Sequence, residues 1–373
     1  MYEGNSRHFD WSVKSHLVHY AAQRFLSGQN GYYLLRLSEW LAQIPVRLIS
    51  MKAIVIKEDE ARTPLWQDVA DPSQKAGEVL VDVHYTALNR ADLMQRAGAY
   101  PPPAGASEIL GLEMSGVVRD AGESTFKKGD EVCALLTGGG YAEQVTVPAE
   151  LLMPVPEAWT LEEAGGLPEV FFTSYLNLFM EAGLQKGERA LVHGGASGIG
   201  TASIQLIKVA GADVYITAGT DEKVAFCKDL GADLAINYRD EDFAERIREH
   251  VGDKGVNVIM DMVGADYFER NIDLLTLNGR MVFISSLSGT KTELDIRKLM
   301  GKRIWLKGST LRARPVEEKV RIRKAFMAQF WEALEARQIK PITDSVYPIE
   351  ETASAHEHMR NNKNIGKILL KVR

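Results

Sequence analysis

The stretch "HGGASGIG", His193–Gly200, decides the fold, because it joins an apolar strand to an amphipathic helix. The residues before it, "RALV", are typical of a buried strand, and "TASIQLIKVAG" after it has the spacing of a helix. Glycines at such a junction let the backbone approach a pyrophosphate, whose charge is favoured by free N–H groups at the helix N-terminus. The context therefore predicts a dinucleotide-binding turn. The alternative is tight strand–helix packing, which would not require three glycines and a serine together.

The pattern around this turn is a repeat of short apolar strands and amphipathic helices. Further strands are expected at "DVYITAG", "DLAINY" and "VNVIMDMVG", with helices at "DEKVAFCKDLG" and "EDFAERIREHV" between them. Two more strands are expected near "GRMVFISS" and "RIWLKGST". Such alternation predicts an α/β fold, a Rossmann-type parallel sheet with helices on both faces. We assign residues 173–312 to this domain.

The tip of the second strand indicates which dinucleotide fits. An acidic residue there usually accepts a hydrogen bond from the ribose 2′-OH. Here the tip is Gly219, followed by Thr220 and Lys223, while Tyr238 and Arg239 come at the end of the next strand. A neutral tip beside hydroxyls and cations suits a dianionic 2′-phosphate, so the sequence predicts NADPH over NADH. The alternative is that Lys223 is an ordinary surface lysine.

The region from Met51 to Phe172 is different, since its short strands are separated by glycine and proline, as in "GAYPPPAGA". It predicts a mostly antiparallel β domain with a loop-rich cleft. The residues from Glu317 onward are predicted to form one long helix and then the strand "GKILLKV", which returns to this domain. We therefore assign residues 51–172 plus 313–373 to a second domain.

Composition limits the compartment and the partners. The 373 residues carry a formal net charge of -6, which argues against binding nucleic acid. The basic stretch at residues 312–324 alternates with acidic residues and is typical of a solvated helix face. Cys133 and Cys227 form no Cys-x-x-Cys pair, which excludes a multi-cysteine zinc site and favours a reducing, cytoplasmic location. No apolar run reaches the about 20 residues that span a bilayer.

Residues 1–50 differ from the rest. They lack the apolar centre and cleavage site of a secretory signal, and three acidic residues in them argue against a transit peptide. Because "MKAIVI" at Met51 has the pattern of an opening strand, we predict that residues 1–50 are an extension outside the fold.

Two segments of the β domain carry a family resemblance, "ALNRADLMQRAGAYPPP" (Ala87–Pro103) and "ILGLEMSGVV" (Ile109–Val118). With "HGGASGIG" and "NKNIGKILL", they resemble the medium-chain dehydrogenase/reductase superfamily, and within it the zinc-free quinone oxidoreductases of the p53-inducible branch. The resemblance covers Met51 to Arg373. It implies a GroES-like catalytic domain and a homodimer or tetramer that pairs edge strands of the nucleotide domain, with "GRMVFISS" as the candidate edge.

The chain departs from the alcohol dehydrogenases of that superfamily at their catalytic zinc. The tripeptide that resembles their Gly-His-Glu motif is Gly111-Leu112-Glu113, and Asn89 stands where they have a first cysteine ligand. These residues do not provide the usual ligands, so we predict no metal. Without a Lewis acid, alcohol oxidation is disfavoured, and direct hydride transfer to a quinone or conjugated enone is expected.

The resemblance also implies site residues. The candidate catalytic residues are Tyr100, Asn89 and Asp92. The candidate cofactor-binding residues are Thr173, Ser197, Gly198, Ile199, Gly200, Gly219, Thr220, Lys223, Tyr238, Val263, Ile284 and Leu311. Met262 is a further candidate beside the nicotinamide ribose.

Alternatives stay open for several of these residues. Tyr100 is expected to donate from its phenol to a substrate carbonyl, but it also suits packing on the following proline turn. Asn89 is expected to hydrogen-bond the cofactor or a carbonyl. Asp92 either acts in the cleft or caps the helix "ADLMQRAG". For His193, packing of the backbone is favoured over catalysis.

The sequence thus predicts an NADPH-dependent, metal-free quinone oxidoreductase. One alternative is an enone or enoyl-thioester reductase on the same fold, which needs a proton donor at the α-carbon. Another is an NADPH-binding protein with little catalysis. RNA recognition is not expected, since the chain has a net charge of -6 and no stripe of basic and aromatic residues.

Overall fold

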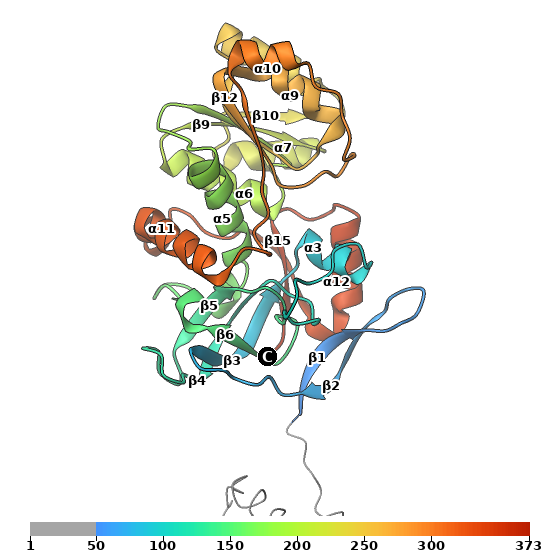
Figure 1. Ribbon diagram of the computed structural model, residues 1–373, viewed down its shortest axis with the longest axis vertical. Coiled ribbons are helices and arrows are strands. Elements are labelled where there is room, and N and C mark those ends of the chain that lie inside the picture. Colours follow the sequence, from blue (N-terminus) through green and yellow to red (C-terminus); the bar gives the residue numbers. More distant parts are fainter. Residues whose placement is uncertain (1–49) are drawn as a thin grey trace, which may run out of the picture. The chain divides into compact units, whose positions relative to one another are not determined.

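The computed structural model describes residues 50–373 (Figure 1). This part of the chain holds a six-stranded parallel sheet, a seven-stranded sheet that is mostly antiparallel, and a two-stranded sheet. The predicted α/β fold class, with a Rossmann-type and a mostly antiparallel part, is confirmed. No helix among the described residues is both long and apolar enough to cross a membrane. The predicted extension lies outside the described residues, apart from Ser50, which begins β1.

The six-stranded sheet contains the turn at residues 193–200. Its order is β10-β9-β8-β11-β12-β13 with every pairing parallel, which is the doubly wound order 3-2-1-4-5-6. The strands are β8 (Arg189–His193), β9 (Asp213–Ala218), β10 (Leu234–Asn237), β11 (Val256–Asp261), β12 (Leu275–Phe283) and β13 (Trp305–Gly308). The central strands are almost wholly apolar because helices cover both faces.

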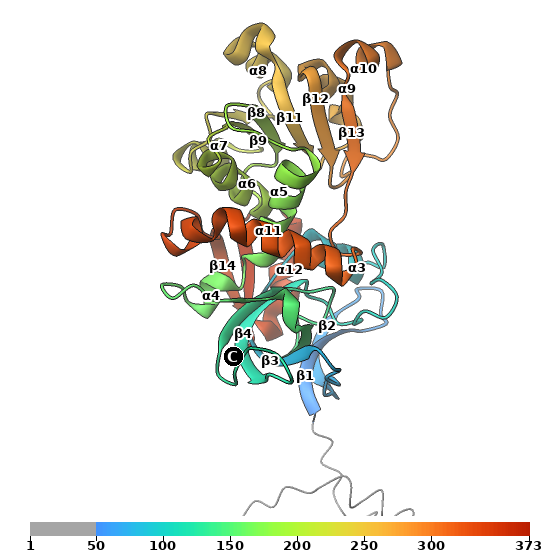
Figure 2. The ribbon, with the colours of Figure 1, turned by 60° about the vertical axis from the view of Figure 1, so that its left-hand side comes forward.

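Two pairs of helices cover the two faces of the parallel sheet (Figure 2). Residues of α6 and α7 pack in one apolar core, and residues of α8 and α9 pack in another on the opposite face. The helices of this region are α6 (Gly198–Val209), α7 (Asp221–Asp229), α8 (Phe243–Val251), α9 (Phe268–Leu274) and α10 (Ile296–Lys302).

The seven-stranded sheet has the order β14-β15-β3-β4-β5-β7, with β6 also paired to β3. In β3, Val79, Val81 and Val83 alternate with less buried residues, so one face packs in the core. The strands of this part are β1 (Ser50–Ile56), β2 (Pro64–Ala70), β3 (Glu78–Ala87), β4 (Glu113–Asp120), β5 (Glu131–Leu135), β6 (Gln144–Pro148), β7 (Leu152–Pro154), β14 (Thr343–Pro348) and β15 (Lys367–Lys371). The helices are α3 (Arg90–Arg96), α4 (Leu161–Ala164), α11 (Val316–Glu335) and α12 (Thr352–Arg360).

Strand β15 returns to this sheet, as the sequence predicts. It pairs antiparallel with β3 and parallel with β14, so the end of the chain lies beside strands from its beginning (Figure 1). Directly before β15, the backbone N–H of Gly366 donates to the carbonyl of Ala196 at 2.8 Å. This bond ties the last strand of the antiparallel sheet to the glycine-rich turn of the parallel sheet.

Helix α5 (Pro168–Tyr175) lies between the two sheets in sequence and continues as a π-helix over Leu176–Glu181. Its aromatic residues Phe171 and Phe172 pack against Phe326 of α11. The domain boundary placed at 172/173 falls inside α5 and the one at 312/313 lies before α11; both stay predictions.

One expectation is wrong: "GRMVFISS" is not an edge strand. It belongs to β12, which pairs with β11 on one side and with β13 on the other, so the edge strands of this sheet are β10 and β13. A strand's neighbours depend on crossover connections that its own sequence does not contain.

Two elements, β14 and α12, also follow α11 where the sequence indicated only a helix and a strand. The polar sequence "TDSVYP" of β14 has little burial and gave no strand signal.

Candidate active site

The nucleotide turn, residues 193–200, has the geometry of an anion site. Ser197 is the N-cap of α6, and its hydroxyl oxygen accepts from the Gly200 N–H at 3.0 Å. A Cβ on Gly200 would lie 2.4 Å from the Gly194 carbonyl oxygen, so only glycine fits there. A parallel β-bridge pairs Ser197 with Gly366, while within residues 50–373 the N–H of Ile199 has no acceptor. A free N–H at the start of a helix suits a pyrophosphate.

The tip of β9 brings together the residues predicted to select the cofactor. A Cβ on Gly219 would lie 2.7 Å from the Tyr238 hydroxyl, which explains the glycine. Thr220 is the N-cap of α7, since its hydroxyl accepts from the Lys223 N–H at 3.3 Å. The Lys223 ammonium donates to the Asn362 carbonyl at 2.6 Å, in the segment between α12 and β15. The lysine therefore crosses from the parallel sheet to the C-terminal segment.

Lys223 lies among charges of both signs. Burial lowers the pKa of its ammonium; Asp344 and Glu222 oppose this, and the cations Arg239 and Arg90 add to it. Arg90 also donates to the Asn362 side chain. Two cations, Lys223 and Arg90, thus meet at Asn362, an arrangement that suits an anionic group.

The candidates for the nicotinamide region lie after the carboxyl ends of β11, β12 and β13. The Val263 N–H donates to the Asp261 carboxylate at 2.6 Å, and the Ile284 N–H donates to the Asp261 carbonyl at 2.9 Å. The Met262 sulfur packs against Gly194 of the nucleotide turn. In open α/β sheets this edge is where ligands bind.

Two candidates for the nicotinamide region, Thr173 and Leu311, are buried. Thr173 lies on α5 and is 7% exposed, and Leu311 is 6% exposed and packs in the same apolar core as α5 and α11. Their direct contact with a cofactor stays a prediction.

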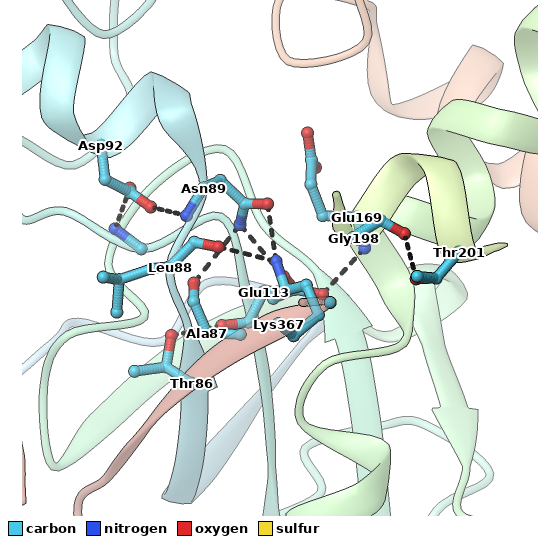
Figure 3. Close-up of polar contacts among 12 residues, drawn as sticks. Thr86, Ala87, Leu88, Asn89, Asp92, Glu113, Glu169, Gly198, Thr201 and Lys367 are labelled. Atoms are coloured by element: carbon cyan, nitrogen blue, oxygen red, sulfur yellow. Dashed lines mark hydrogen bonds and ion pairs between the residues drawn. The ribbon is translucent and has the colours of Figure 1, made fainter. Parts of the chain in front are cut away.

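A buried ion pair lies against the nucleotide turn (Figure 3). The Lys367 ammonium of β15 is 2.7 Å from the Glu113 carboxylate of β4, and the side chains are 3% and 0% exposed. The same ammonium donates to the Asn89 side-chain oxygen at 2.8 Å and to the Leu88 carbonyl at 2.7 Å. The Asn89 amide in turn donates to Glu113 at 3.0 Å. We call Asn89, Glu113 and Lys367 the buried charge cluster.

The cluster connects directly to the cofactor side. A Cβ on Gly198 would lie 2.7 Å from Cδ of Lys367, so the lysine stem packs on the glycine that opens α6. Both ends of the Asn89 amide are engaged within the cluster. The structure thus gives Asn89 a positioning role, while its direct bond to cofactor or substrate stays a prediction.

Asp92 is fully buried, and it caps α3 while also contacting two residues outside the helix. Its carboxylate accepts from the Asn89 N–H at 2.8 Å, from the Gly111 N–H at 3.1 Å and from the Tyr141 hydroxyl at 3.3 Å. Burial raises the pKa of the carboxyl to about 6 despite these donors. Capping accounts for the bond from Asn89, the bonds from Gly111 and Tyr141 join α3 to other parts of the fold, and a catalytic role stays a prediction.

Tyr100 lies over a cation that the sequence reading did not include. The Arg312 guanidinium carbon is 5.4 Å from the centre of the Tyr100 ring, a cation–π contact. Arg312 is 3% exposed, and it donates to the Gln95 side chain at 2.7 Å and to the Thr137 carbonyl at 2.8 Å. Burial raises the pKa of the Tyr100 phenol, Arg312 opposes this rise, and Glu169 adds to it.

His193 is a buried structural residue, in line with the reading favoured from the sequence. Its ring nitrogens lie 3.1 Å from the Thr217 hydroxyl and 2.9 Å from the Asn271 side-chain oxygen. Its ring also contacts Phe243 and Tyr267 edge-on. Burial lowers the pKa of the imidazole.

Sequence reasoning missed Lys367, Arg312 and Glu169. A signal existed for Lys367, which is a charged residue directly before the apolar run of "GKILLKV" in a strand placed inside the domain. Arg312 belongs to a stretch read as a solvated face, yet it is buried. Glu169 follows the proline that begins α5, which is an ordinary place for an acidic residue.

Comparison with known proteins follows the same division of the chain. Residues 75–157 match the alcohol dehydrogenase GroES-like domain, and residues 198–325 match the zinc-binding dehydrogenase family. The quinone oxidoreductase of Sus scrofa is 31% identical over 310 residues, which are 82% of this chain and 92% of the pig protein.

Solved structures of the same family also resemble this chain. The quinone oxidoreductase of Thermus thermophilus, also solved with NADPH, has a TM-score of 0.74 and 28% identity, covering 86% of this chain and 100% of that one. An NAD-dependent alcohol dehydrogenase has a TM-score of 0.76 and 28% identity, covering 87% of this chain and 100% of that one. With the parallel sheet, the nucleotide turn and the GroES-like part in place, the chain belongs to the medium-chain dehydrogenase/reductase superfamily of oxidoreductase enzymes.

Proposed function

We propose that this oxidoreductase is an NADPH-dependent, metal-free quinone oxidoreductase that reduces a quinone or a related conjugated carbonyl. The observation that carries the proposal is the Lys367 ammonium. It contacts Asn89, which resembles the first cysteine ligand of related alcohol dehydrogenases, and Glu113, which follows Leu112 at the position of their histidine ligand. A lysine there supplies positive charge but cannot coordinate an alcohol and lower its pKa as zinc does. Reduction of an electron-poor acceptor does not need that step.

The cofactor assignment rests on the fit of this chain to a nicotinamide dinucleotide phosphate. Ser197, Gly198 and Gly200 would hold the pyrophosphate on the first turn of α6, and Gly219 and Lys223 would receive the 2′-phosphate. When bound, the cofactor supplies hydride. NADPH rather than NADH is proposed because Gly219 stands at the position of the usual acidic residue and the cations Lys223 and Arg239 lie nearby.

On the substrate side, Tyr100 and the buried charge cluster orient the acceptor. The phenol of Tyr100 has no hydrogen-bond partner among residues 50–373, so it is available to donate to a carbonyl oxygen. Arg312 behind the ring stabilises negative charge that develops on that oxygen.

The test is steady-state oxidation of NADPH and of NADH by chelator-treated protein, with ortho-naphthoquinone as acceptor. We expect turnover with NADPH that the chelator does not change, and weak turnover with NADH. In Lys223→Gln the kcat/KM for NADPH should fall about tenfold or more while that for NADH changes little, since a charge-assisted bond of about 1.5–3 kcal/mol is lost.

Other outcomes would contradict separate parts of the proposal. Equal use of both cofactors would contradict the 2′-phosphate assignment, and a loss of activity with chelator would contradict the metal-free mechanism. If an enone is reduced and no quinone is, the enone or enoyl-thioester reductase becomes the better assignment. If NADPH binds and neither acceptor reacts, an NADPH-binding protein with little catalysis becomes the better assignment.

We also propose a homodimer formed through β13 and a cytoplasmic location. Strand β13 is one of the two edge strands of the parallel sheet, and three large apolar side chains are exposed on it and on α10: Trp305 at 73%, Met300 at 71% and Ile296 at 62%. Replacing Trp305 by Lys should shift the protein to a monomer in sedimentation equilibrium. A wild-type monomer would contradict this part of the proposal.

A further inference from the structure

Glu169 is a carboxylic acid held at the meeting point of the two halves of the site. It lies in the first turn of α5, four residues before Thr173, so both side chains project from the same face of the helix. Its backbone N–H donates to the Glu113 carboxylate at 2.9 Å, which fixes this turn to the buried charge cluster. The next residue, Val170, packs on Gly198 of the nucleotide turn.

The Glu169 carboxyl is not used by the fold. Within residues 50–373 neither of its oxygens has a hydrogen-bond or ion-pair partner, and Oε2 is shielded from solvent. Figure 3 shows the side chain directed away from Glu113 and Lys367, although an ammonium lies close by. Shielded polar groups in folded proteins are almost always paired, so an unpaired carboxyl beside a ligand site suggests a partner that arrives with the ligand.

Burial and the neighbouring acids keep this carboxyl protonated at neutral pH. Burial is the main cause that raises its pKa to about 8, and the nearby carboxylate of Glu113 adds to the rise. The other charged or titratable groups that face it are Lys367 on β15, Asp92 on α3, Lys319 on α11 and Tyr100 in the loop after α3. The two lysines favour the carboxylate but do not overcome burial and the neighbouring acids.

We propose that Glu169 is the acid that protonates the reduced acceptor, an inference that rests on the proposed function. Hydride adds two electrons to the quinone or enone and leaves negative charge on the carbonyl oxygen. The Glu169 O–H bond breaks, its proton forms the new bond at the charged atom of the acceptor, and the carboxylate remains until solvent reprotonates it. One hydride and this proton give the hydroquinone or the saturated ketone, so atoms and electrons balance.

The test is the pH dependence of kcat/KM for NADPH oxidation with ortho-naphthoquinone and with an enone, in wild type, Glu169→Gln and Glu157→Gln. Glu157 is an exposed residue that undergoes the same chemical change outside the site. In wild type, kcat/KM should fall above pH about 8, where the acid loses its proton. In Glu169→Gln, kcat/KM should be about 100-fold lower near neutral pH and should lack this fall, and Glu157→Gln should match wild type.

Two further measurements separate catalysis from folding. The NADPH affinity of Glu169→Gln, from fluorescence titration, should stay within about twofold of wild type, which shows an intact cofactor site. In wild type without cofactor, an infrared band of a protonated carboxyl should disappear as the pH rises through about 8, and Glu169→Gln should lack it.

The outcomes distinguish this inference from the proposed function. If wild type reduces an acceptor and Glu169→Gln keeps both the rate and the fall at high pH, the acid role is wrong and the proposed function stands. Absence of the infrared band would also overturn the acid role. If wild type oxidises NADPH with neither acceptor, the proposed function fails and the acid role fails with it.

Discussion

The nucleotide turn and the buried charge cluster are in contact through Gly198 and Lys367. The turn consists of backbone groups of one segment, and the cluster consists of side chains from three distant segments. The turn is a single run of eight residues, His193–Gly200, whose function lies in its backbone: absent side chains, a free N–H group and a helix N-terminus. The cluster consists of three side chains from positions far apart in the sequence, Asn89, Glu113 and Lys367, and its function lies in charge that is shielded from water.

The two regions should therefore fail in different ways. A backbone site is disrupted by added volume, because no room exists for a Cβ. A charge cluster is disrupted by removal of one partner, because the remaining charge loses its compensation in a place without water. Substitutions of matched chemistry inside and outside each region test this difference.

The largest effect is expected from Lys367→Met, which keeps much of the stem but leaves Glu113 buried without its cation. Removing one partner of a buried pair costs about 3–5 kcal/mol, so the free energy of unfolding in urea should fall by that amount. The double variant Lys367→Met/Glu113→Gln should recover part of the loss. In the control Lys208→Met, which breaks an exposed pair with Asp233, the loss should stay below about 1 kcal/mol. Equal losses in both single variants would contradict the comparison.

The next effect is expected in the turn itself, from Gly200→Ala. The new Cβ would lie 2.4 Å from the Gly194 carbonyl, so the turn must open, at a cost of about 3 kcal/mol of stability and with loss of NADPH binding. The matched control is Gly301→Ala in α10, where a Cβ meets nothing within 4 Å. This change should leave NADPH binding intact and stabilise the helix by up to about 1 kcal/mol. Calorimetry of unfolding and of cofactor binding measures both, and an unchanged Gly200→Ala would contradict the steric argument.

Gly219→Asp adds both volume and negative charge at the tip of β9, so it combines the two kinds of disruption. The NADPH affinity should fall about 10–100-fold, which is about 1.4–2.8 kcal/mol, while the NADH affinity falls less. Gly219→Ala separates the two causes, because it has the same Cβ close to the Tyr238 hydroxyl without the charge. If both variants lose the two cofactors equally, the effect is steric only.

The smallest effect concerns the pH dependence of stability. The ordinary pKa of a glutamate is 4.5, and that of Glu169 in the folded chain is about 8. Between these values the folded state binds the proton more tightly than the unfolded state, so the contribution of this group to stability is lost as the pH rises. Relative to Glu169→Gln, wild type should lose about 1 kcal/mol between pH 5 and 8 in urea unfolding, an amount reduced by the partial exposure of the side chain. Parallel pH curves for the two proteins would contradict the raised pKa.

The sequence by itself determined the α/β fold class, the nucleotide turn and the neutral strand tip. These features are local: the period of apolar residues, the spacing of glycines and the position of Gly219 are all present within short windows. The sequence also indicated that "GKILLKV" returns to the first domain, because an apolar strand at the end of the chain requires a partner sheet.

Only the tertiary structure decided which strands are the edges, and which charges meet. That Lys367 lies on Glu113 depends on β15 pairing with β3, and β3 with β4, across more than two hundred and fifty residues of chain. Arg312 and Glu169 could not be separated from ordinary surface charges, since burial is a property of the packed elements around a residue. Burial away from water changes the pKa values of these charged groups and the strength of their ion pairs. A short stretch of sequence does not show which residues will be buried.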